Sequence, residues 1–364
     1  MLLIIIKALL LNTTTMDNQN TEEIDLENEL ENKLFGKKKS NNHKYMDKSV
    51  LLCGSKQDYI IMGTCNDINR RQFDWSVTVD GHGTNSFIDI IKKTDFIPFM
   101  IQNDPITHII EHFRSLNGTY LDLEMGVFTK NRKYKKSSGC TIIIVKIYDD
   151  LIEGAIIGDS RCAVYIDDEE VFISTPHNIK NPLEVERLSE RPNIVTDFNG
   201  DKIIQIIGDN KAILIPSIYT TFEDNTRMGL TQALGHDCIT GFEPEKFSFK
   251  YNKEQHLRFV SGSDGFWDMQ LNKTDIMLSG NDLIINNLMD ELIPDITQDN
   301  EDILKLTAVK LTQKALKRWA QVWNVYMDNN DGKYNTIRTS YPTNGYDDIC
   351  VFVWDNNMMV SNET

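Results

Sequence analysis

Four aspartates stand at the ends of apolar stretches, beside glycines or short polar turns: Asp80 in VTVDGHG, Asp159 in IIGDSR, Asp264 in VSGSDGFWD and Asp347 in GYDDICVFVW. A carboxylate at the end of a buried strand is held by a rigid element yet faces solvent, and a following glycine lets the backbone approach a ligand closely. Several such carboxylates together would make an oxygen site for Mg²⁺ or Mn²⁺. A lone Asp–Gly pair is more typical of a turn, so it is their recurrence that indicates a metal site.

The apolar stretches that carry these aspartates have the length and β-branched composition of strands. Several are apolar on both faces, which predicts that they are covered on both sides. Strands close in sequence, such as 152–157 and 162–166, favour antiparallel pairing and an α+β fold. The predicted strands are 59–62, 74–79, 141–148, 152–157, 162–166, 258–261 and 349–354, and the predicted helices are 85–92, 106–123, 182–188, 276–292 and 303–322.

From Lys48 onward, short apolar runs alternate with Gly, Asn and Asp. This pattern indicates one domain over residues 46–356, with insertions near 197–225 and 327–343 and a tail at 357–364. We expect residues 1–45 to form a disordered leader, since they end in a Lys/Asn-rich run. The apolar start MLLIIIKALLL is shorter than the roughly 20 residues of a membrane helix. It also lacks the charge order and cleavage site of a signal peptide, so neither a signal peptide nor a membrane anchor is expected.

The composition excludes some partners. The 364 residues carry a formal net charge of −16, which supplies no positive field for nucleic acid. None of the six cysteines forms a CxxC pair, and several lie in apolar runs, as small buried hydrophobes do. This pattern favours a reducing compartment, so we expect a cytoplasmic protein, and we expect it to be a monomer.

Seven short motifs then occur in one order: DGHG at 80–83, SGCT at 138–141, GDSR at 158–161, a histidine with NPLExxR within 175–187, LTQALG at 230–235, SDGFWD at 263–268 and DDI at 347–349. Together they resemble the signature of metal-dependent serine/threonine protein phosphatases of type 2C, the PPM family. The likeness covers roughly residues 50 to 355. Any one motif could arise by chance, but seven in sequence are specific.

The resemblance implies a four-layer αββα sandwich of two antiparallel sheets flanked by helices. It also implies two Mn²⁺ or Mg²⁺ ions at one end of the sandwich, with a third, weaker site at Asp159. The implied protein ligands are the bridging Asp80, the Gly81 carbonyl, Asp264 and Asp347, with Asp67 acting through metal-bound water.

The implied reaction is hydrolysis of phosphoserine and phosphothreonine in protein substrates by a water that the cations activate. His82 would be the general acid that protonates the leaving oxygen; taken without its motif, it would read as a turn histidine. The family's phosphate-binding arginine is missing from Met62–Cys65, and Arg70 or Arg71 could replace it, or both could be solvated. A phosphatase fold that binds without catalysis is therefore the alternative.

Three other sequence patterns suggest alternative binding sites. His108 to His112 spells HxxEH, a zinc-peptidase pattern that lacks a third ligand and fits equally an amphipathic helix with Ile109, Ile110 and Phe113 inward. The acidic run 328–332 cannot coordinate calcium as an EF-hand does, because Met327 and Arg338 occupy the end positions. The basic run 130–136 is typical of a solvated loop, and could alternatively attract acidic substrate.

Overall fold

The computed structural model describes residues 44–116, 119–122, 127–130, 137–178, 181–189, 195–197, 202–205, 212–216, 219–221, 227–236, 240–267, 303–319, 322–327, 334–339 and 347–357. The chain divides into two compact units, Met1–Lys39 and Ser40–Thr364. The first unit lies outside the described residues, and so do nearly all of the expected leader and most of the tail. Within the described part of the chain, no helix is long and apolar enough to cross a membrane.

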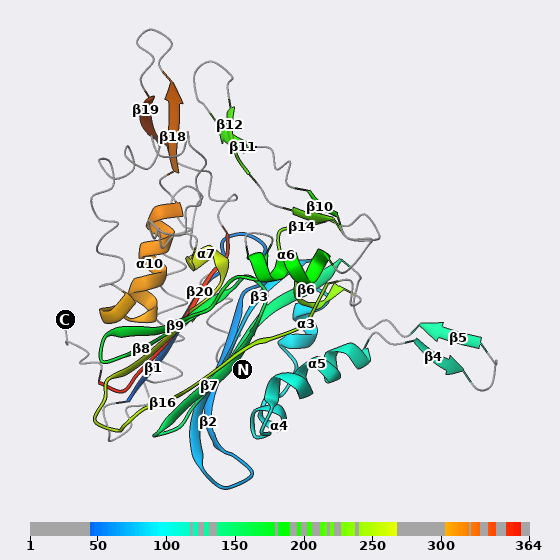
Figure 1. The fold of residues 1–364 in the computed structure, drawn as a ribbon, viewed down its shortest axis with the longest axis vertical. Coiled ribbons are helices and arrows are strands. Elements are labelled where there is room, and N and C mark those ends of the chain that lie inside the picture. Colours follow the sequence, from blue (N-terminus) through cyan, green and yellow to red (C-terminus); the bar gives the residue numbers. More distant parts are fainter. Residues whose placement is uncertain are drawn as a thin grey trace, which may run out of the picture. The chain divides into compact units, whose positions relative to one another are not determined.

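Six strands form the larger sheet, in which β3 and β6 lie at the centre (Figure 1). Its order is β16-β7-β6-β3-β2, β15 pairs with β6, and every pairing is antiparallel. The bounds are β2 Tyr59–Asn66, β3 Gln72–Gly83, β6 Ser138–Ile147, β7 Leu151–Ile157, β15 Leu234–Gly235 and β16 Glu245–Lys250.

Five strands form the second sheet, in the order β1-β20-β17-β8-β9, again with antiparallel pairing throughout. Its strands are β1 Tyr45–Leu51, β8 Arg161–Ile166, β9 Glu169–Ile173, β17 Leu257–Gly262 and β20 Ile349–Asp355. The described residues also form four smaller sheets: β4–β5, β10–β13–β14, β11–β12 and β18–β19. Their bounds are β4 Thr119–Asp122, β5 Val127–Lys130, β10 Val195–Asp197, β11 Lys202–Gln205, β12 Ala212–Pro216, β13 Tyr219–Thr221, β14 Arg227–Met228, β18 Val322–Met327 and β19 Tyr334–Thr339.

The alternation of side chains along β6 explains the layers. Ile143, Val145 and Ile147 lie in a core between the two sheets, together with apolar residues of β8, β17 and β20. Ile142 and Ile144 point to the opposite face and join a second core with the helices there. Because successive strand residues face opposite sides, a strand that is covered on both faces is expected to be mostly apolar, as the run Ile142–Val145 of β6 is.

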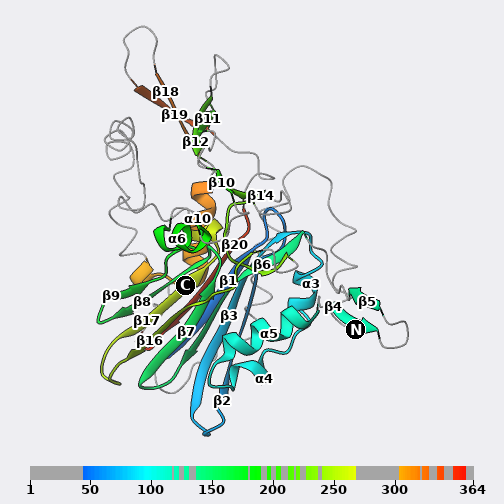
Figure 2. The same ribbon diagram turned by 45° about the vertical axis from the view of Figure 1, so that its right-hand side comes forward.

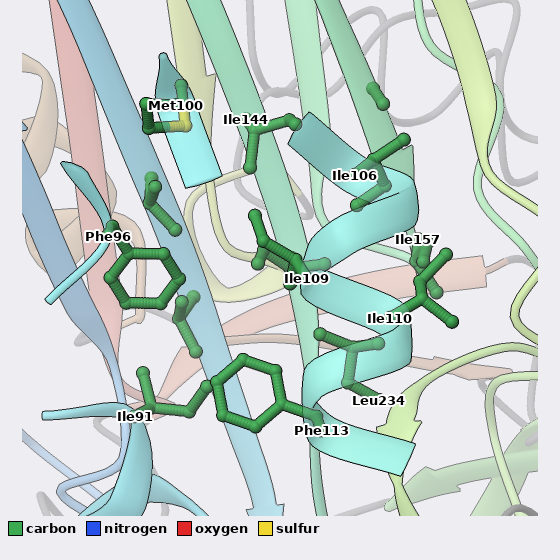
Figure 3. Close-up of a cluster of buried hydrophobic side chains, with 14 of the residues drawn as sticks. Ile91, Phe96, Met100, Ile106, Ile109, Ile110, Phe113, Ile144, Ile157 and Leu234 are labelled. Carbon is green, nitrogen blue, oxygen red and sulfur yellow. The ribbon is translucent and has the colours of Figure 1, made fainter. Parts of the chain in front are cut away.

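Helices cover the outer face of each sheet, which completes the expected four-layer αββα sandwich (Figure 2). On the six-stranded sheet, Ile109 and Phe113 of α5 pack against Ile144, Ile157 and Leu234 (Figure 3). The helices on that side are α3 Ile88–Ile91, α4 Ile97–Met100 and α5 Pro105–Leu116; α7 Asp264–Trp267 and α10 Ala308–Trp319 cover the other sheet, and α6 spans Pro182–Ser189.

Every predicted strand is present, but two expectations about their neighbours are wrong. Strands β7 and β8 do not pair with each other, because the turn at 158–160 carries the chain from one sheet to the other. The helix expected over 106–123 ends at Leu116, and β4 begins at Thr119. The predicted helix at 276–292 lies outside the described residues.

The HxxEH pattern lies on α5, where its residues have structural contacts. His112 packs against the rings of Phe99 and Phe113, with centroids 5.2 and 5.0 Å apart. Ile109, Ile110 and Phe113 are buried, as an amphipathic helix requires. The amphipathic-helix interpretation of this motif is therefore confirmed.

Candidate metal centre

Three of the four strand-end aspartates meet at one end of the sandwich. Asp80, Asp159 and Asp264 each offer a carboxylate oxygen, and these oxygens all lie within 4.8 Å of one another. Asp80 belongs to β3 of the six-stranded sheet, whereas Asp264 follows β17 of the five-stranded sheet. Asp159 lies in the turn that connects the two sheets. The group is thus assembled from both sheets.

The turn that carries Asp159 is fixed to the strands beside Asp80. Thr141, which pairs with Asp80 across β3 and β6, shares a hydrogen bond of 2.6 Å with the Ser160 hydroxyl. Gly158 has a φ of +109°, and a Cβ there would lie 2.5 Å from the Thr141 Cβ. Only glycine fits both that backbone and that contact, which explains the glycine before Asp159.

His177 holds the same turn from the other side. Its backbone N–H donates to the Gly158 carbonyl at 2.9 Å, and its Nδ1 accepts from the Gly158 N–H at 3.0 Å. Burial lowers the pKa of His177 to about 4, so the ring stays neutral and keeps Nδ1 available as an acceptor. The histidine of the NPLExxR motif therefore positions Asp159 rather than doing chemistry.

Asp264 is fixed by close contact between β17 and the start of β20. The Ser263 N–H donates to the Cys350 carbonyl at 3.2 Å, and the Ser263 hydroxyl accepts from the Cys350 N–H at 3.0 Å. At Gly265 a Cβ would lie 2.1 Å from the Asp348 carbonyl oxygen, so the glycine after Asp264 is required by this approach. A buried hydroxyl pair, Thr78 and Ser261 at 2.8 Å, joins the two sheets nearby.

Carboxylates dominate the electrostatics of the site. Burial raises the pKa of Asp80 well above its ordinary value, and the charges of Asp264, Asp58, Asp159 and Asp347 raise it further. Asp347 is not a member of the three-residue group, yet its charge acts on Asp80, and it lies beside Gly265. The four predicted aspartates are therefore neighbours, with Asp159 closer to Asp80 and Asp264 than the sequence led us to expect.

Asp58 is a fifth acid of this site, and it was not anticipated. It is 2 % exposed, and its Oδ2 has no hydrogen-bond partner among the residues that the structure describes. Burial first, and then the charges of Asp348 and Asp347, raise its pKa to about 7. A buried carboxylate oxygen without a partner is rare unless it serves a ligand. The signal in the sequence was the pair Gln57–Asp58, directly before β2.

Asp348 holds the loop that leads to Asp58. Its carboxylate accepts from the Gly54 N–H at 2.8 Å, the Gln57 N–H at 2.7 Å and the Ser55 hydroxyl at 3.0 Å. The Gln57 side chain in turn donates to the Gly83 carbonyl at 3.2 Å and to Asn85 at 2.7 Å. Asp348, the second aspartate of the DDI motif, therefore has a structural role: it fixes the loop 54–57 that leads to Asp58.

Asp67, Arg70 and Arg71 lie at the opposite end of β2 and β3, which corrects their expected roles. The register places Asn66 opposite Gln72, so this turn is roughly 25 Å along the strand from Asp80. Asp67 accepts from the Asn69 and Arg71 backbone N–H groups at 2.8 Å, as turn aspartates do. Arg71 pairs with Asp150 and covers the Tyr148 ring. These residues stabilise the hairpin turn.

His82 and Gly81 follow Asp80 on the same strand. Gly81 is buried, and a Cβ there would lie 2.4 Å from Ile88. The Nδ1 of His82 lies 2.7 Å from the Nε2 of His236, and the His82 Nε2 is buried without a hydrogen-bond partner in the described part of the chain. Because strand residues two apart share a face, His82 lies on the same side of β3 as Asp80.

The donors present fit Mg²⁺ or Mn²⁺. Carboxylate oxygens from several chain segments converge, and these hard cations prefer such oxygens over sulfur or imidazole. The unpartnered Asp58 oxygen and the raised pKa of Asp80 both indicate a site that a positive charge would stabilise.

The sequence model of the protein phosphatase 2C family matches residues 112–321, which is more than half of the chain. No curated protein sequence matches. Among solved structures, a sex-determining protein of C. elegans is 15% identical, with a TM-score of 0.45, over 90% of this chain and 67% of that one. The S. agalactiae serine/threonine phosphatase is 17% identical, with a TM-score of 0.40, over 85% and 99%.

A third structure is the catalytic domain of the serine/threonine protein phosphatase PstP with two manganese ions, at 14% identity and a TM-score of 0.38, over 86% of this chain and 96% of that one. The assignment rests on the family match, which the motifs and the converging aspartates of this chain accompany. The chain belongs to the protein phosphatase 2C family of serine/threonine protein phosphatases.

Proposed function

We propose that this chain hydrolyses phosphoserine and phosphothreonine in protein substrates with the help of Mn²⁺ or Mg²⁺. The observation that carries the proposal is the convergence of Asp80, Asp159 and Asp264 within 4.8 Å, in a chain of the protein phosphatase 2C family. Asp347 and the Gly81 carbonyl complete the proposed ligand set. Asp58, in place of Asp67, is the acid proposed to act through metal-bound water.

Two cations are proposed, with Asp80 between them, and a third, weaker one at Asp159. When bound, such cations acidify a water nucleophile and neutralise the phosphoryl oxygens. The described residues support the rest of the reaction. The aspartates hold their positions because both sheets and the turn at 158–160 are tied together, so the protein does not have to reorganise as charge develops.

His82 is the proposed general acid. The leaving serine or threonine oxygen is a poor leaving group unless it receives a proton, and such a proton transfer is worth about 10²–10⁴ in rate. His82 shares the face of β3 with Asp80, and its Nε2 is not engaged by another described residue. When that nitrogen carries a proton, no described residue competes for it, so the proton can pass to the departing oxygen.

Lys56 is the proposed contact for the substrate phosphate, in place of Arg70 and Arg71. It directly precedes Gln57 and Asp58, its side chain is exposed, and its φ of +61° belongs to a tight loop that Asp348 holds. A lysine supplies a point charge to phosphate rather than the two-pronged grip of an arginine. We therefore expect weaker substrate binding than an arginine would give.

The test is hydrolysis of a phosphoserine peptide with Mn²⁺ or Mg²⁺, with and without EDTA. We expect turnover that chelation abolishes and that either cation restores. Turnover that survives exhaustive chelation would exclude the metal-dependent mechanism. Binding of the phosphopeptide without turnover at any Mn²⁺ or Mg²⁺ concentration would instead favour a phosphatase fold that acts as a binding module.

A further inference from the structure

Asn85 is an exposed residue beside the metal centre, and one side of its amide is fixed by a buried side chain. It lies two residues after Gly83, the last residue of β3. The Gln57 side chain, which is 1% exposed, donates from its Nε2 to the Asn85 Oδ1 at 2.7 Å and to the Gly83 carbonyl at 3.2 Å. The reaction described above gives Asn85 no role.

The chemistry of these three groups decides which atom of each amide is the nitrogen. A backbone carbonyl only accepts hydrogen bonds, so the Gln57 atom that faces the Gly83 carbonyl must be the nitrogen. That nitrogen also faces Asn85, whose nearer atom must therefore be the oxygen. The Asn85 Nδ2 keeps both of its hydrogens, and it donates to no other residue in the described part of the chain.

The surrounding contacts hold Asn85 in this position. Asp348 accepts from the Gln57 N–H at 2.7 Å, so the side chain that anchors Asn85 is itself anchored. The Asn85 carbonyl accepts from the Asp89 N–H at 2.8 Å, which fixes the backbone there. Because Oδ1 faces the buried Gln57, the planar amide directs Nδ2 toward solvent. A donor held in this way loses little conformational freedom when it binds a ligand.

Gln57 also places Asn85 beside the loop that the proposed function uses. Lys56, the proposed phosphate contact, directly precedes Gln57, and Asp58, an acid of the site, directly follows it. Asn85 is joined to the same residue by a hydrogen bond. The carboxylates of the metal centre repel an anionic substrate wherever cations do not neutralise them. An amide N–H and a lysine ammonium, in contrast, both attract a phosphate oxygen.

We propose that Asn85 is a substrate-binding residue whose Nδ2 donates a hydrogen bond to a phosphoryl oxygen of the substrate. The inference rests on the proposed function, because it names a second contact, beside Lys56, for the phosphate of the same substrate. Asn85 takes no part in bond breaking. It therefore binds the ground state and the transition state alike, and its loss should appear in KM rather than in kcat.

Two substitutions separate the outward donor from the anchoring oxygen. Asn85→Asp keeps an oxygen for the Gln57 Nε2 but replaces the outward NH2 with a carboxylate oxygen, so a donor to phosphate becomes a repelling charge. Asn85→Ala removes the donor and adds no charge. Asn85→Ala should raise KM for a phosphoserine peptide by about 10-fold, as loss of a hydrogen bond to a charged group does. Asn85→Asp should raise KM further, and at saturating Mn²⁺ kcat of both variants should change by less than about twofold.

Smaller ligands decide which part of the substrate Asn85 contacts. Inorganic phosphate, the product, and p-nitrophenyl phosphate carry the phosphoryl oxygens without a peptide. We expect the inhibition constant of inorganic phosphate and the KM of p-nitrophenyl phosphate to rise by the same factor as the KM of the phosphopeptide. A rise confined to the phosphopeptide would assign Asn85 to the peptide chain and overturn the proposal. Unchanged values for all three ligands would overturn it as well.

Asn69→Asp is the matched control. Asn69 is also an exposed asparagine, and it lies in the turn between β2 and β3, at the end of these strands that is far from Asp80. The substitution changes the net charge as Asn85→Asp does, and KM should stay at the wild-type value. Equal rises in KM for the two Asp variants would attribute the effect to net charge and contradict a contact. Thermal unfolding checks that each variant is folded at the assay temperature.

Phosphate binding can be measured without any turnover. Titration calorimetry of inorganic phosphate into the Mn²⁺-loaded full chain gives the affinity of the wild type and of each variant. If neither ester is hydrolysed, the proposed function fails, while a weaker phosphate affinity of Asn85→Ala and Asn85→Asp still supports the contact. Affinities equal to that of the wild type, or a wild type that binds no phosphate, would overturn the inference.

Discussion

The two ends of the strand pair β17–β20 bury charge in opposite ways. At one end, Arg258 lies opposite Asp355 in the register, and both side chains are almost fully buried. At the other end, the strands lead to Asp264 and Asp347, where the strongest charges acting on the nearby Asp80 are those of other acids. One end of the pair supplies its own counter-charge, and the other gathers like charges.

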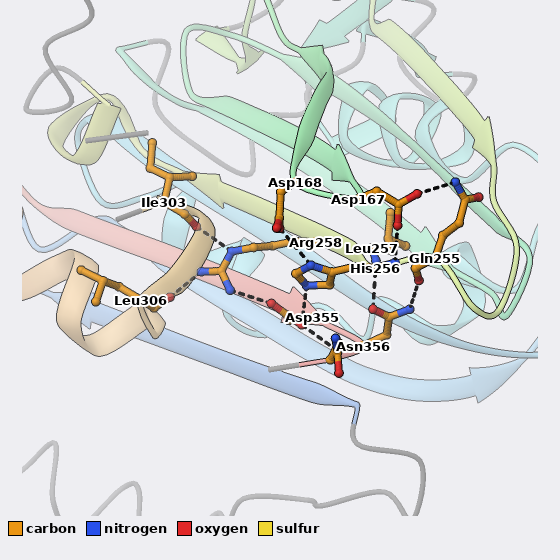
Figure 4. A network of polar contacts seen from close by, with 11 residues as sticks. Asp167, Asp168, Gln255, His256, Leu257, Arg258, Ile303, Leu306, Asp355 and Asn356 are labelled. Carbon is orange, nitrogen blue, oxygen red and sulfur yellow. Dashed lines mark hydrogen bonds and ion pairs between the residues drawn. The ribbon is translucent and has the colours of Figure 1, made fainter. Parts of the chain in front are cut away.

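The paired end is a structural network (Figure 4). The Arg258 guanidinium donates to Asp355 at 2.8 Å and to the Ile303 carbonyl at 2.6 Å, which ties β17 to the segment before α10. His256 lies 3.0 Å from both Asp355 and Asp168. Burial alone would raise the pKa of Asp355, but the bonds from His256, Asn357 and Arg258 lower it.

The difference teaches which buried acids to associate with function. A buried acid that has an arginine and a histidine beside it is satisfied by the protein itself, so it needs nothing from solution. Acids that raise one another's pKa are electrostatically unfavourable in the fold alone and become favourable when a cation binds. In the sequence, both ends appear only as aspartates near apolar strands. The residues that surround each aspartate in the structure distinguish the structural acid from the candidate metal ligands.

The largest effect is expected at the end of the strand pair where Asp264 and Asp347 lie close to Asp80. Asp80→Asn and Asp264→Asn should each lower kcat by roughly 10³-fold, the scale on which preorganised charge stabilisation acts. Without metal, their melting temperature should equal or slightly exceed that of the wild type, because a repelling charge is removed. Thermal unfolding with and without Mn²⁺ checks this, since Mn²⁺ should stabilise the wild type more than Asp80→Asn. An equal response to Mn²⁺ would contradict the ligand role of Asp80.

At the end of the strand pair that holds Arg258 and Asp355, a substitution should change the stability of the fold rather than kcat. Arg258→Met leaves Asp355 buried without its main counter-charge, which should destabilise the fold by about 3–5 kcal/mol. Denaturant unfolding measures the loss, and kcat per folded molecule should stay near the wild-type value. As the matched control, Arg258→Met/Asp355→Leu should recover part of the stability. A fall in kcat with unchanged stability would break the contrast between the two ends.

A smaller effect is expected for substrate binding. Lys56→Ala should raise KM by about 10-fold with little change in kcat, since a bond to a charged group contributes about 1.5–3 kcal/mol and uniform binding appears in KM. Arg70→Ala and Arg71→Ala are the matched controls, because the register places them at the far end of β2 and β3. A KM that rises for either arginine but not for Lys56 would reverse the assignment.

The smallest effect is a pH dependence at the paired end. The hydrogen bond with Asp355 raises the pKa of His256 above its ordinary 6.5, against the effect of burial. Protonated His256 therefore stabilises the folded state fully below 6.5, and this contribution is lost as pH rises through the raised folded value. The stability of the wild type relative to His256→Asn should be greater near about pH 6 than near about pH 9. A difference that is constant with pH would show that His256 does not contribute through its charge.

Much of the fold and part of the candidate site could be predicted from residues that are adjacent in the sequence. The strand ends at Asp80, Asp159 and Asp264 were predictable because an apolar run, an aspartate and a glycine are adjacent in sequence. The strands β6 and β20 were predictable because burial on both faces requires continuous apolar residues. The arrangement of β7 and β8 in different sheets was not, since the turn between them resembles a hairpin.

Asp58 and His236 needed the three-dimensional register. Asp58 follows Gln57 and Asp67 follows Asn66, so the local sequence does not distinguish the two aspartates, and only the pairing of β2 with β3 places Asp67 at the end far from Asp80. The contact of His236 with His82 depends on a glycine in a third segment, Gly139. No spacing along the chain encodes such a coincidence.

The way in which the acids straddle both sheets has a kinetic consequence. A cation held by Asp80 of one sheet and Asp264 of the other acts as a removable cross-link between the two layers, which the buried Thr78–Ser261 pair also joins. If the sheets close over the site only after the rate-limiting step of folding, Mn²⁺ will slow the unfolding of the chain and leave its refolding rate nearly unchanged. The bound metal would then set how long a folded molecule persists, as well as whether it can turn over substrate.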